Sequence, residues 1–301
     1  MFLRLDPPIV NASGILSYPE VFVLLERRGA AFGGYITKSV GPVEKGGNEN
    51  PVVFSPAPGG GPVLNSLALP TQSPEDWVRD LEGLSLKAPL IVSVYGGDAE
   101  EFAGVLERLE PYGAAFELNL GCPNKVPGEV TIMESIGQSP ALSAQVVAAC
   151  RGRTEKPLVA KLSPNADYLA VAEAALGAGA DALGCGNTLG PGLAIDIRTR
   201  RAVLAGFTGG ISGPSLKPIN LRMVYEAYRR FRVPIVAYGG IESWRDGVEY
   251  LLAGASVLGV GTACMGKSTD EIVRLSRELW DGVQAYLDGA PLSALIGAAH
   301  A

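Results

Sequence analysis

The 301-residue sequence has little histidine, few cysteines and no excess of positive charge. Its one histidine, His300, is the penultimate residue, which argues against histidine-based triads, histidine metal sites and imidazole acid–base catalysis. The 25 Lys and Arg residues against 31 Asp and Glu residues give a formal net charge of −6, so no sequence-wide basic field favours nucleic acid or an anionic membrane. Any proton transfer must therefore use a side chain other than histidine.

The 4 cysteines lie far apart and form no Cys-x-x-Cys pair, which predicts neither a zinc site nor a cysteine-ligated iron–sulfur cluster. Reduced cysteines favour a cytoplasmic protein. Charges at Arg4 and Asp6 leave no apolar core for a secretory signal. The longest uncharged stretch, between Glu249 and Lys267, falls short of the roughly 20 apolar residues that a membrane helix needs. We expect no metal, no membrane and no nucleic-acid partner.

Short β-rich runs alternate with helix-period segments along the chain. The strand candidates are Ile9–Ser13, Tyr35–Val40, Leu90–Tyr95, Ala115–Leu120, Leu158–Leu162, Ala182–Gly186, Ile235–Tyr238 and Val257–Val260. The helix candidates are Pro19–Arg28, Pro74–Leu84, Ala99–Leu109, Pro140–Cys150, Asp167–Leu176, Leu216–Phe231, Trp244–Leu252 and Asp270–Leu287. Ser73, Ser139 and Ser243 stand where helix N-caps are expected.

Eight such units predict a (β/α)8 TIM barrel, and a doubly wound sheet is the rival because strand order cannot be read from one sequence. With no break in composition, we expect one domain over residues 1–301. Two stretches, Gly41–Ser73 and Leu189–Pro214, exceed ordinary connections. We expect functional lids or small added hairpins there, at the carboxyl-terminal face of the barrel.

The carboxyl ends of the strand candidates, where barrel enzymes place their chemistry, carry amides, hydroxyls, two lysines and paired glycines. Gly239-Gly240 and Gly261-Thr262 follow the last two strands, where barrels commonly bind phosphate on backbone N–H groups. Lys38 and Lys161 each follow an apolar run. One such lysine can simply reach from a strand end to solvent, but two in an acidic protein suggest an anionic ligand.

Cys122 lies in the segment Glu117–Asn124, where a strand runs into a loop rich in glycine and proline. A thiol in a partly exposed loop is reactive if it can ionise. Because the body of the chain has no histidine, Cys122 is the best-placed proton acceptor. We expect the other three cysteines to be small apolar fillers.

Nine motifs spread over nearly the whole chain are similar to those of one family. They are NASG (11–14), TKS (37–39), LNSLALP (64–70), ELNLGCPN (117–124), VAKLSPN (159–165), NT (187–188) with AID (194–196), TGGISGPSLKPINLRMVYEAY (208–228), YGGIES (238–243) and LLAGASVLGVGTA (251–263). The chain thereby resembles the class 1, FMN-dependent dihydroorotate dehydrogenases. The block at 208–228 is especially similar to the NAD-linked subtype, whose catalytic chain works with a subunit carrying FAD and an iron–sulfur cluster. The resemblance also implies a homodimer.

The resemblance implies oxidation of dihydroorotate to orotate in pyrimidine synthesis, with FMN in the barrel. Cys122 would remove a proton from ring carbon 5 while a hydride leaves carbon 6 for the flavin. The implied substrate contacts are Lys38, Asn65, Ser66, Leu67, Ala68, Leu69, Asn119, Asn124, Asn187 and Thr188. The implied flavin contacts are Ser13, Lys38, Ser39, Ser93, Asn119, Lys161, Gly186, Gly213, Gly239, Gly240, Gly261 and Thr262, the last four around the phosphate.

Some residues differ from the family's usual pattern, and two other functions stay open. Ala68 lies where the family usually has glycine, and Ser93 lies where it often has asparagine. Residues 46–61 and 125–136 also differ from the family's usual sequence, and these differences bear on substrate choice and subunit pairing. NLGCPN also resembles the loop of tRNA dihydrouridine synthases, although RNA binding needs a cationic surface. The third hypothesis is a non-catalytic barrel that binds flavin or phosphate. The final electron acceptor, NAD, fumarate or a quinone, is also open.

Overall fold

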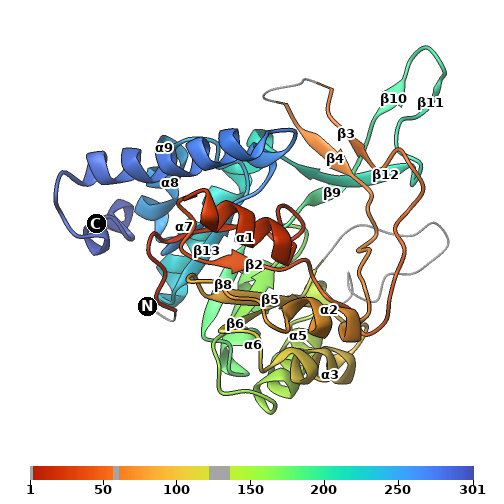
Figure 1. The fold of residues 1–301 in the computed structure, drawn as a ribbon, viewed down its shortest axis with the longest axis horizontal. Coiled ribbons are helices and arrows are strands. Elements are labelled where there is room, and N and C mark those ends of the chain that lie inside the picture. Colours follow the sequence, from red (N-terminus) through yellow and green to blue (C-terminus); the bar gives the residue numbers. More distant parts are fainter. Residues whose placement is uncertain (1–2, 57–60, 122–135) are drawn as a thin grey trace.

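A computed structural model describes residues 3–56, 61–121 and 136–301, and its centre is a parallel sheet of eight strands (Figure 1). These strands are β1 (Ile9–Asn11), β2 (Tyr35–Ile36), β5 (Leu90–Val94), β6 (Ala115–Asn119), β7 (Leu158–Leu162), β8 (Ala182–Cys185), β13 (Ile235–Tyr238) and β14 (Val257–Val260). From β2 onward each strand pairs with the next one along the chain, and β14 pairs in parallel with β1. This order is that of a (β/α)8 barrel and not of a doubly wound sheet, so the predicted fold is confirmed.

The closure between β1 and β2 depends on a side chain. The backbone contributes only a single parallel bridge, between Val10 and Gly34. Asn11 is fully buried, and its Oδ1 accepts the Ile36 N–H at 2.7 Å while its Nδ2 donates to the Ile36 carbonyl at 2.8 Å. The amide thus substitutes for a ladder pair where β2 is two residues long.

Strand β2 is shorter than the predicted range Tyr35–Val40. Beyond Ile36 a side chain enters the pairing, because the Thr37 hydroxyl accepts the Ser93 N–H at 3.0 Å. Regular strand pairing with β5 ends there, and only a single bridge, between Val40 and Val94, follows. The predicted strand was therefore correct in place but too long.

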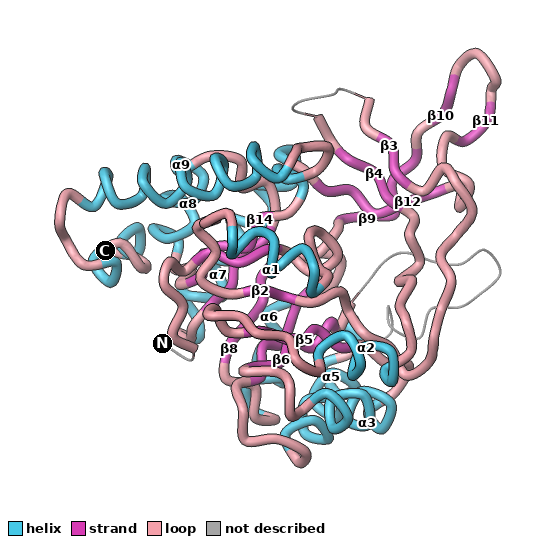
Figure 2. The backbone as a smooth tube through the Cα atoms, in the orientation of Figure 1, coloured by secondary structure: helices cyan, strands magenta, loops and turns pink. Residues whose placement is uncertain are grey.

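Helices connect successive barrel strands and pack on the outside of the barrel, as Figure 2 shows. They are α1 (Pro19–Arg27), α2 (Pro74–Leu81), α3 (Ala99–Leu109), α5 (Pro140–Arg151), α6 (Tyr168–Gly177), α7 (Lys217–Phe231), α8 (Trp244–Ala253) and α9 (Thr269–Leu287). The Ser73 and Ser139 hydroxyls accept the N–H groups of Asp76 and Leu142 at 3.1 and 3.3 Å, which confirms these two N-caps. None of the described helices is long and apolar enough to cross a membrane.

The two long connections form a second, antiparallel sheet. Strands β3 (Val53–Phe54) and β4 (Val63–Asn65) come from the first connection, and β9 (Leu189–Leu193) and β12 (Thr208–Ser212) come from the second. The strand order is β3-β4-β12-β9. A hairpin of β10 (Ile195–Asp196) and β11 (Arg201–Ala202) projects from the body beside this sheet (Figure 1). The expectation of added hairpins is confirmed.

The barrel interior consists of layers. Each barrel strand contributes one residue to an apolar layer of Val10, Ile36, Ile91, Ala115, Val159, Ala182, Val236 and Val257. Side chains alternate across a strand, so the residues two positions further on also face inward. On four strands these residues are Ser93, Glu117, Lys161 and Tyr238. A polar layer therefore lies on the apolar one, toward the carboxyl ends of the strands.

Candidate active site

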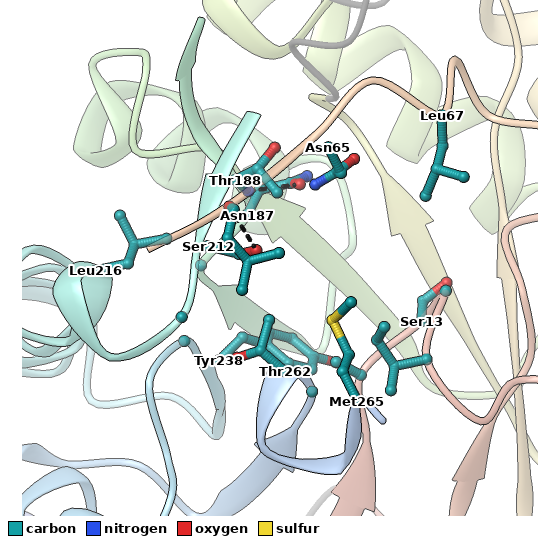
Figure 3. A pocket seen from close by; sticks show the side chains of 18 of the residues that line it. Ser13, Asn65, Leu67, Asn187, Thr188, Ser212, Leu216, Tyr238, Thr262 and Met265 are labelled. Carbon is teal, nitrogen blue, oxygen red and sulfur yellow. Dashed lines mark hydrogen bonds between the residues drawn. The ribbon is translucent and has the colours of Figure 1, made fainter. Parts of the chain in front are cut away.

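A cavity of about 370 Å³ lies where the carboxyl ends of the barrel strands meet the antiparallel sheet (Figure 3). Its size is within the range of small-molecule sites. Most of the predicted site residues line it, namely Ser13, Lys38, Ser39, Asn65, Leu67, Leu69, Asn119, Lys161, Gly186, Asn187, Thr188, Gly213, Gly239, Gly240, Gly261 and Thr262. Residues from both sheets thus share one cavity, although they lie far apart in the sequence.

Five predicted residues do not appear in this lining. Ser66, Ala68 and Ser93 are buried behind it. Cys122 and Asn124 lie outside the described residues, as does most of the atypical segment 125–136. The roles predicted for these five residues stay predictions.

The turn after β13 requires glycine. Gly239 and Gly240 have φ of 105° and 67°, in the left-handed region that other residues rarely adopt. A Cβ on Gly239 would lie 2.3 Å from Asn220 Nδ2, and one on Gly240 would lie 2.8 Å from Lys217 Cβ. Asn220 in turn is fully buried and donates to the Tyr238 carbonyl at 2.9 Å. The glycines therefore bring bare backbone to the cavity, which suits close approach of phosphate oxygens.

The floor of the cavity holds Lys161 and Tyr238, and Glu117 lies behind both. Lys161 Nζ is 3.2 Å from Glu117 Oε1, and the Tyr238 hydroxyl donates to Glu117 Oε2 at 2.5 Å. Burial, reinforced by the Glu117 charge, raises the pKa of Tyr238 well above its usual value, so this hydroxyl keeps its proton. Within the described part of the chain no group of three or more His, Cys, Asp and Glu could hold a metal ion.

A run of polar side chains crosses the cavity wall. Asn187 Nδ2 donates to Asn119 Oδ1 at 3.1 Å, and Asn119 Nδ2 donates to Ser39 Oγ at 3.2 Å. Thr188 Oγ1 is buried and has no hydrogen-bond partner among the residues that the structure describes. Figure 3 shows Asn187 and Thr188 beside Asn65, and Tyr238, Thr262 and Met265 grouped in another part of the cavity. This wall can bind the polar edge of a flat ligand.

Ten lining residues were not predicted from the sequence, among them Ser212, Asn220, Tyr238 and Met265. Tyr238 could have been found, because it follows the inward-facing Val236 by two residues on β13. Asn220 carries no such signal, since one polar residue on an amphipathic helix resembles another. Its Oδ1 is buried without a hydrogen-bond partner in the described structure, a feature that only coordinates reveal.

The sequence matches the family model for dihydroorotate dehydrogenase over residues 1–282. The chain belongs to the dihydroorotate dehydrogenase family. This membership confirms the predicted resemblance, and dihydroorotate dehydrogenases are flavin-dependent oxidoreductases of pyrimidine synthesis. The barrel cavity is accordingly the candidate active site of a dihydroorotate dehydrogenase.

Three curated relatives share this similarity over almost their full length. A protein of Thermococcus kodakarensis is 41% identical over 288 residues, which cover 95% of this chain and 90% of the relative. A protein of Pyrococcus furiosus is 39% identical, with coverage of 95% and 91%. One of Pelobacter propionicus is 39% identical over 307 residues, with coverage of 98% and 95%. All three are named dihydroorotate dehydrogenase B (NAD(+)), catalytic subunit.

Proposed function

We propose that this protein uses FMN to oxidise dihydroorotate to orotate. The observation that carries the proposal is a single cavity that joins Lys38 and Lys161 with several amide side chains and with the glycine turns after the last two barrel strands. Family membership sets the reaction. The cavity supplies the groups that such a reaction needs, which are a cation for each anionic ligand group and paired donors and acceptors for a ring.

The residues present fit FMN. Backbone N–H groups at Gly239, Gly240, Gly261 and Thr262 suit the phosphate. The further flavin contacts that we propose are Ser13, Lys38, Ser39, Asn119, Lys161, Gly186 and Gly213, with Ser93 behind Ser39. Two buried polar atoms of the cavity wall, Asn220 Oδ1 and Thr188 Oγ1, lack hydrogen-bond partners in the described structure, and a polar ligand would supply them. When bound, FMN supplies the hydride acceptor.

Dihydroorotate has a carboxylate and a ring with amide edges. We assign Lys38 to the carboxylate and place the amides of Asn65, Asn119 and Asn187 with Thr188 at the ring edges, because an amide offers donor and acceptor without charge. Asn124 belongs to the same proposal. Leu67 and Leu69 line the cavity and would exclude water, while Ser66 and Ala68 shape the segment that carries them.

Cys122 is the proposed base. The other cysteines are poor candidates, because burial raises the pKa of the Cys150 and Cys185 thiols to about 12 and that of Cys264 to about 11. They are neutral thiols at neutral pH. Gly121, which directly precedes Cys122, accepts a hydrogen bond from the cavity-lining Asn187 side chain.

We further propose that the protein is cytoplasmic, has one FMN-binding barrel domain over residues 1–301 and forms a homodimeric core. We also propose a partner, an electron-transfer subunit that carries FAD and an iron–sulfur cluster and passes electrons to NAD. The names of the relatives, which specify NAD(+) and a catalytic subunit, support this partner. Leu193, Ile195, Ile197 and Phe207 on or near the projecting hairpin are exposed, Ile197 by 91%. Exposed apolar side chains in such number suit a protein–protein contact.

The test is anaerobic addition of dihydroorotate to the purified protein. We expect a yellow protein with releasable FMN whose flavin absorbance bleaches on mixing. The Cys122→Ala variant should be reduced about 10²-fold more slowly or worse, because the base is lost. Reduction of the unaltered protein should quicken as pH rises toward about 8.5, where an unperturbed thiol ionises. The Cys150→Ala variant, which removes a buried thiol of α5, is the matched control and should be reduced at the normal rate.

Three outcomes would count against the proposal. A colourless protein that cannot be reconstituted with FMN would rule out the enzyme. Bleaching only by NADPH, with reoxidation by tRNA, would assign a tRNA dihydrouridine synthase. Unchanged reduction of the Cys122→Ala variant would move the proton transfer to another group.

A further inference from the structure

A carboxylate is buried inside the barrel, where the layer below it is apolar. Glu117 on β6 is 0% exposed and faces the interior two residues after Ala115 of the apolar layer. Removing a carboxylate from water costs several kcal/mol, which only close partners offset. A valine would fill such a position without this cost, so the charge at Glu117 calls for an explanation beyond packing.

Three donors surround this carboxylate, two from the neighbouring strands β5 and β7 and one from β13, which does not pair with β6. Lys161 Nζ and Ser93 Oγ lie 3.2 and 3.0 Å from Glu117 Oε1, and the Tyr238 hydroxyl donates to Oε2. Two glycines make room for the longer partners. A Cβ on Gly184 would lie 3.2 Å from Lys161 Cβ, and one on Gly259 would lie 2.2 Å from Tyr238 Cδ1. The whole layer is therefore shaped around the carboxylate.

The hydroxyl groups between the cavity and Glu117 each donate their hydrogen in the direction of Glu117. A hydroxyl has one hydrogen to donate, and that of Ser93 goes to Glu117. Ser39 must then donate to Ser93 at 2.9 Å. Ser39 in turn accepts from Asn119 Nδ2 and from Ser13 Oγ at 3.1 Å. Ser39 thus uses its hydrogen and both lone pairs within the protein, and the negative charge of Glu117 fixes Ser13 as a donor to Ser39, so that Ser13 offers lone pairs to the cavity.

We infer that Glu117 is a positioning residue that sets the electrostatic potential of the cavity floor and, through it, the reduction equilibrium of the flavin. The inference rests on the proposed function. Lys161 lines the cavity, and Glu117 forms an ion pair with its ammonium group on the side away from the cavity. The carboxylate therefore offsets the positive charge of Lys161. Reduction adds negative charge to a flavin, which a cationic floor favours and a buried carboxylate disfavours. Glu117 therefore lowers the flavin potential and helps the reduced flavin to pass its electrons on.

The experiment compares the FMN-loaded protein with its Glu117→Gln variant, which keeps the side-chain shape and removes the charge. Two readouts do not depend on turnover, namely the flavin midpoint potential and the affinity for sulfite. Sulfite adds to flavin N5 and leaves negative charge on the ring, so a more cationic floor binds it more tightly. We expect sulfite binding about tenfold tighter. We also expect a tenfold shift toward reduced flavin, which is about 30 mV more positive for a two-electron couple.

Three further variants separate charge from structure. Glu117→Asp keeps the charge and should stay near the unaltered protein. Tyr238→Phe removes a donor to the carboxylate, leaves its charge less neutralised, and should weaken sulfite binding a few-fold, opposite to Glu117→Gln. This variant carries the test if Glu117→Gln does not fold. Glu26→Gln is the matched control, since Glu26 accepts the Lys87 and Ala88 N–H groups at 3.0 Å before β5, at the other end of the barrel, and should change neither readout.

The outcomes distinguish this inference from the proposed function. An FMN-loaded Glu117→Gln protein with unaltered potential and sulfite affinity would overturn the inference alone, because a purely structural carboxylate changes stability and flavin content only. A Tyr238→Phe shift in the same direction as Glu117→Gln would overturn it as well. Failure of the unaltered protein to hold FMN, or to be reduced by dihydroorotate, would instead overturn the proposed function, and the inference with it.

Discussion

The floor and the roof of the cavity are built in opposite ways. The floor comes from parallel strands of the closed barrel, and its side chains Glu117, Lys161 and Tyr238 are buried, with Lys161 and Tyr238 both bonded to Glu117. The roof comes from the two long connections and is an open antiparallel sheet, in which β3 and β4 are two and three residues long and β9 and β12 are five. Two consecutive roof residues, Ala68 and Leu69, have left-handed φ of 61° and 57°.

The difference suggests that the floor serves the cofactor and the roof serves the substrate. Each floor strand is paired on both sides, and the apolar layer supports it from below, so its charges stay fixed. A resident cofactor needs this constancy, because its potential depends on the charges around it. The roof sheet is open, with β3 and β9 at its edges, and it carries exposed apolar side chains such as Val53 and Leu193. It suits a substrate that enters and leaves at every turnover.

The largest effect that we predict concerns the floor. Lys161→Met would leave the Glu117 carboxylate buried without its cation, and loss of one partner of a buried pair costs about 3–5 kcal/mol. The free energy of unfolding, measured by urea denaturation of the FMN-free protein, should fall by that amount. The double variant Lys161→Met, Glu117→Gln should recover more than half of the loss. A loss below about 1 kcal/mol in the single variant would mean that the floor does not depend on its ion pair.

A smaller effect is expected when the roof loses a polar group. Asn65 lines the cavity from β4, and Asn65→Ala would remove an amide from the proposed substrate edge. We expect the KM for dihydroorotate to rise about tenfold, which corresponds to about 1.4 kcal/mol, with flavin content and midpoint potential unchanged. Asn119→Ala on the floor strand β6 should alter both, since Asn119 also bonds Ser39. If Asn65→Ala loses its flavin, the proposed separation of floor and roof is wrong.

Much of the floor could be predicted from local pattern, and its partners could not. Residues at or just after the end of an apolar strand, such as Lys161 and Gly239, fall at the carboxyl edge whatever the order of the strands. The inward position of Glu117 also follows from its spacing to Ala115. That Tyr238 is its partner depends on a closed barrel, because the two residues are 121 positions apart. The cavity-facing amide of Asn220, on a helix, needed the tertiary structure altogether.

The roof was predicted only as two long connections, because their pairing is non-local. Strand β4 pairs with β12, and Asn65 lies opposite Gly210, 145 residues away. No local pattern selects such a partner. The departure at Ala68 was visible in the sequence, but its meaning came from the backbone, where the left-handed φ explains why glycine is the usual residue there.

The smallest predicted effect tests this strain. An L-residue in the left-handed region costs about 1 kcal/mol or more, and glycine does not have this cost. Ala68→Gly should therefore stabilise the protein by up to about 1 kcal/mol, less what the buried methyl contributes to packing, and should raise Tm by about 1–3 °C. Ala202→Gly in β11, where φ is negative, is the matched control and should lower Tm, because glycine weakens a strand. Equal destabilisation by both would show that packing of the Ala68 methyl outweighs the backbone strain, and the roof would then be better packed than its φ angles suggest.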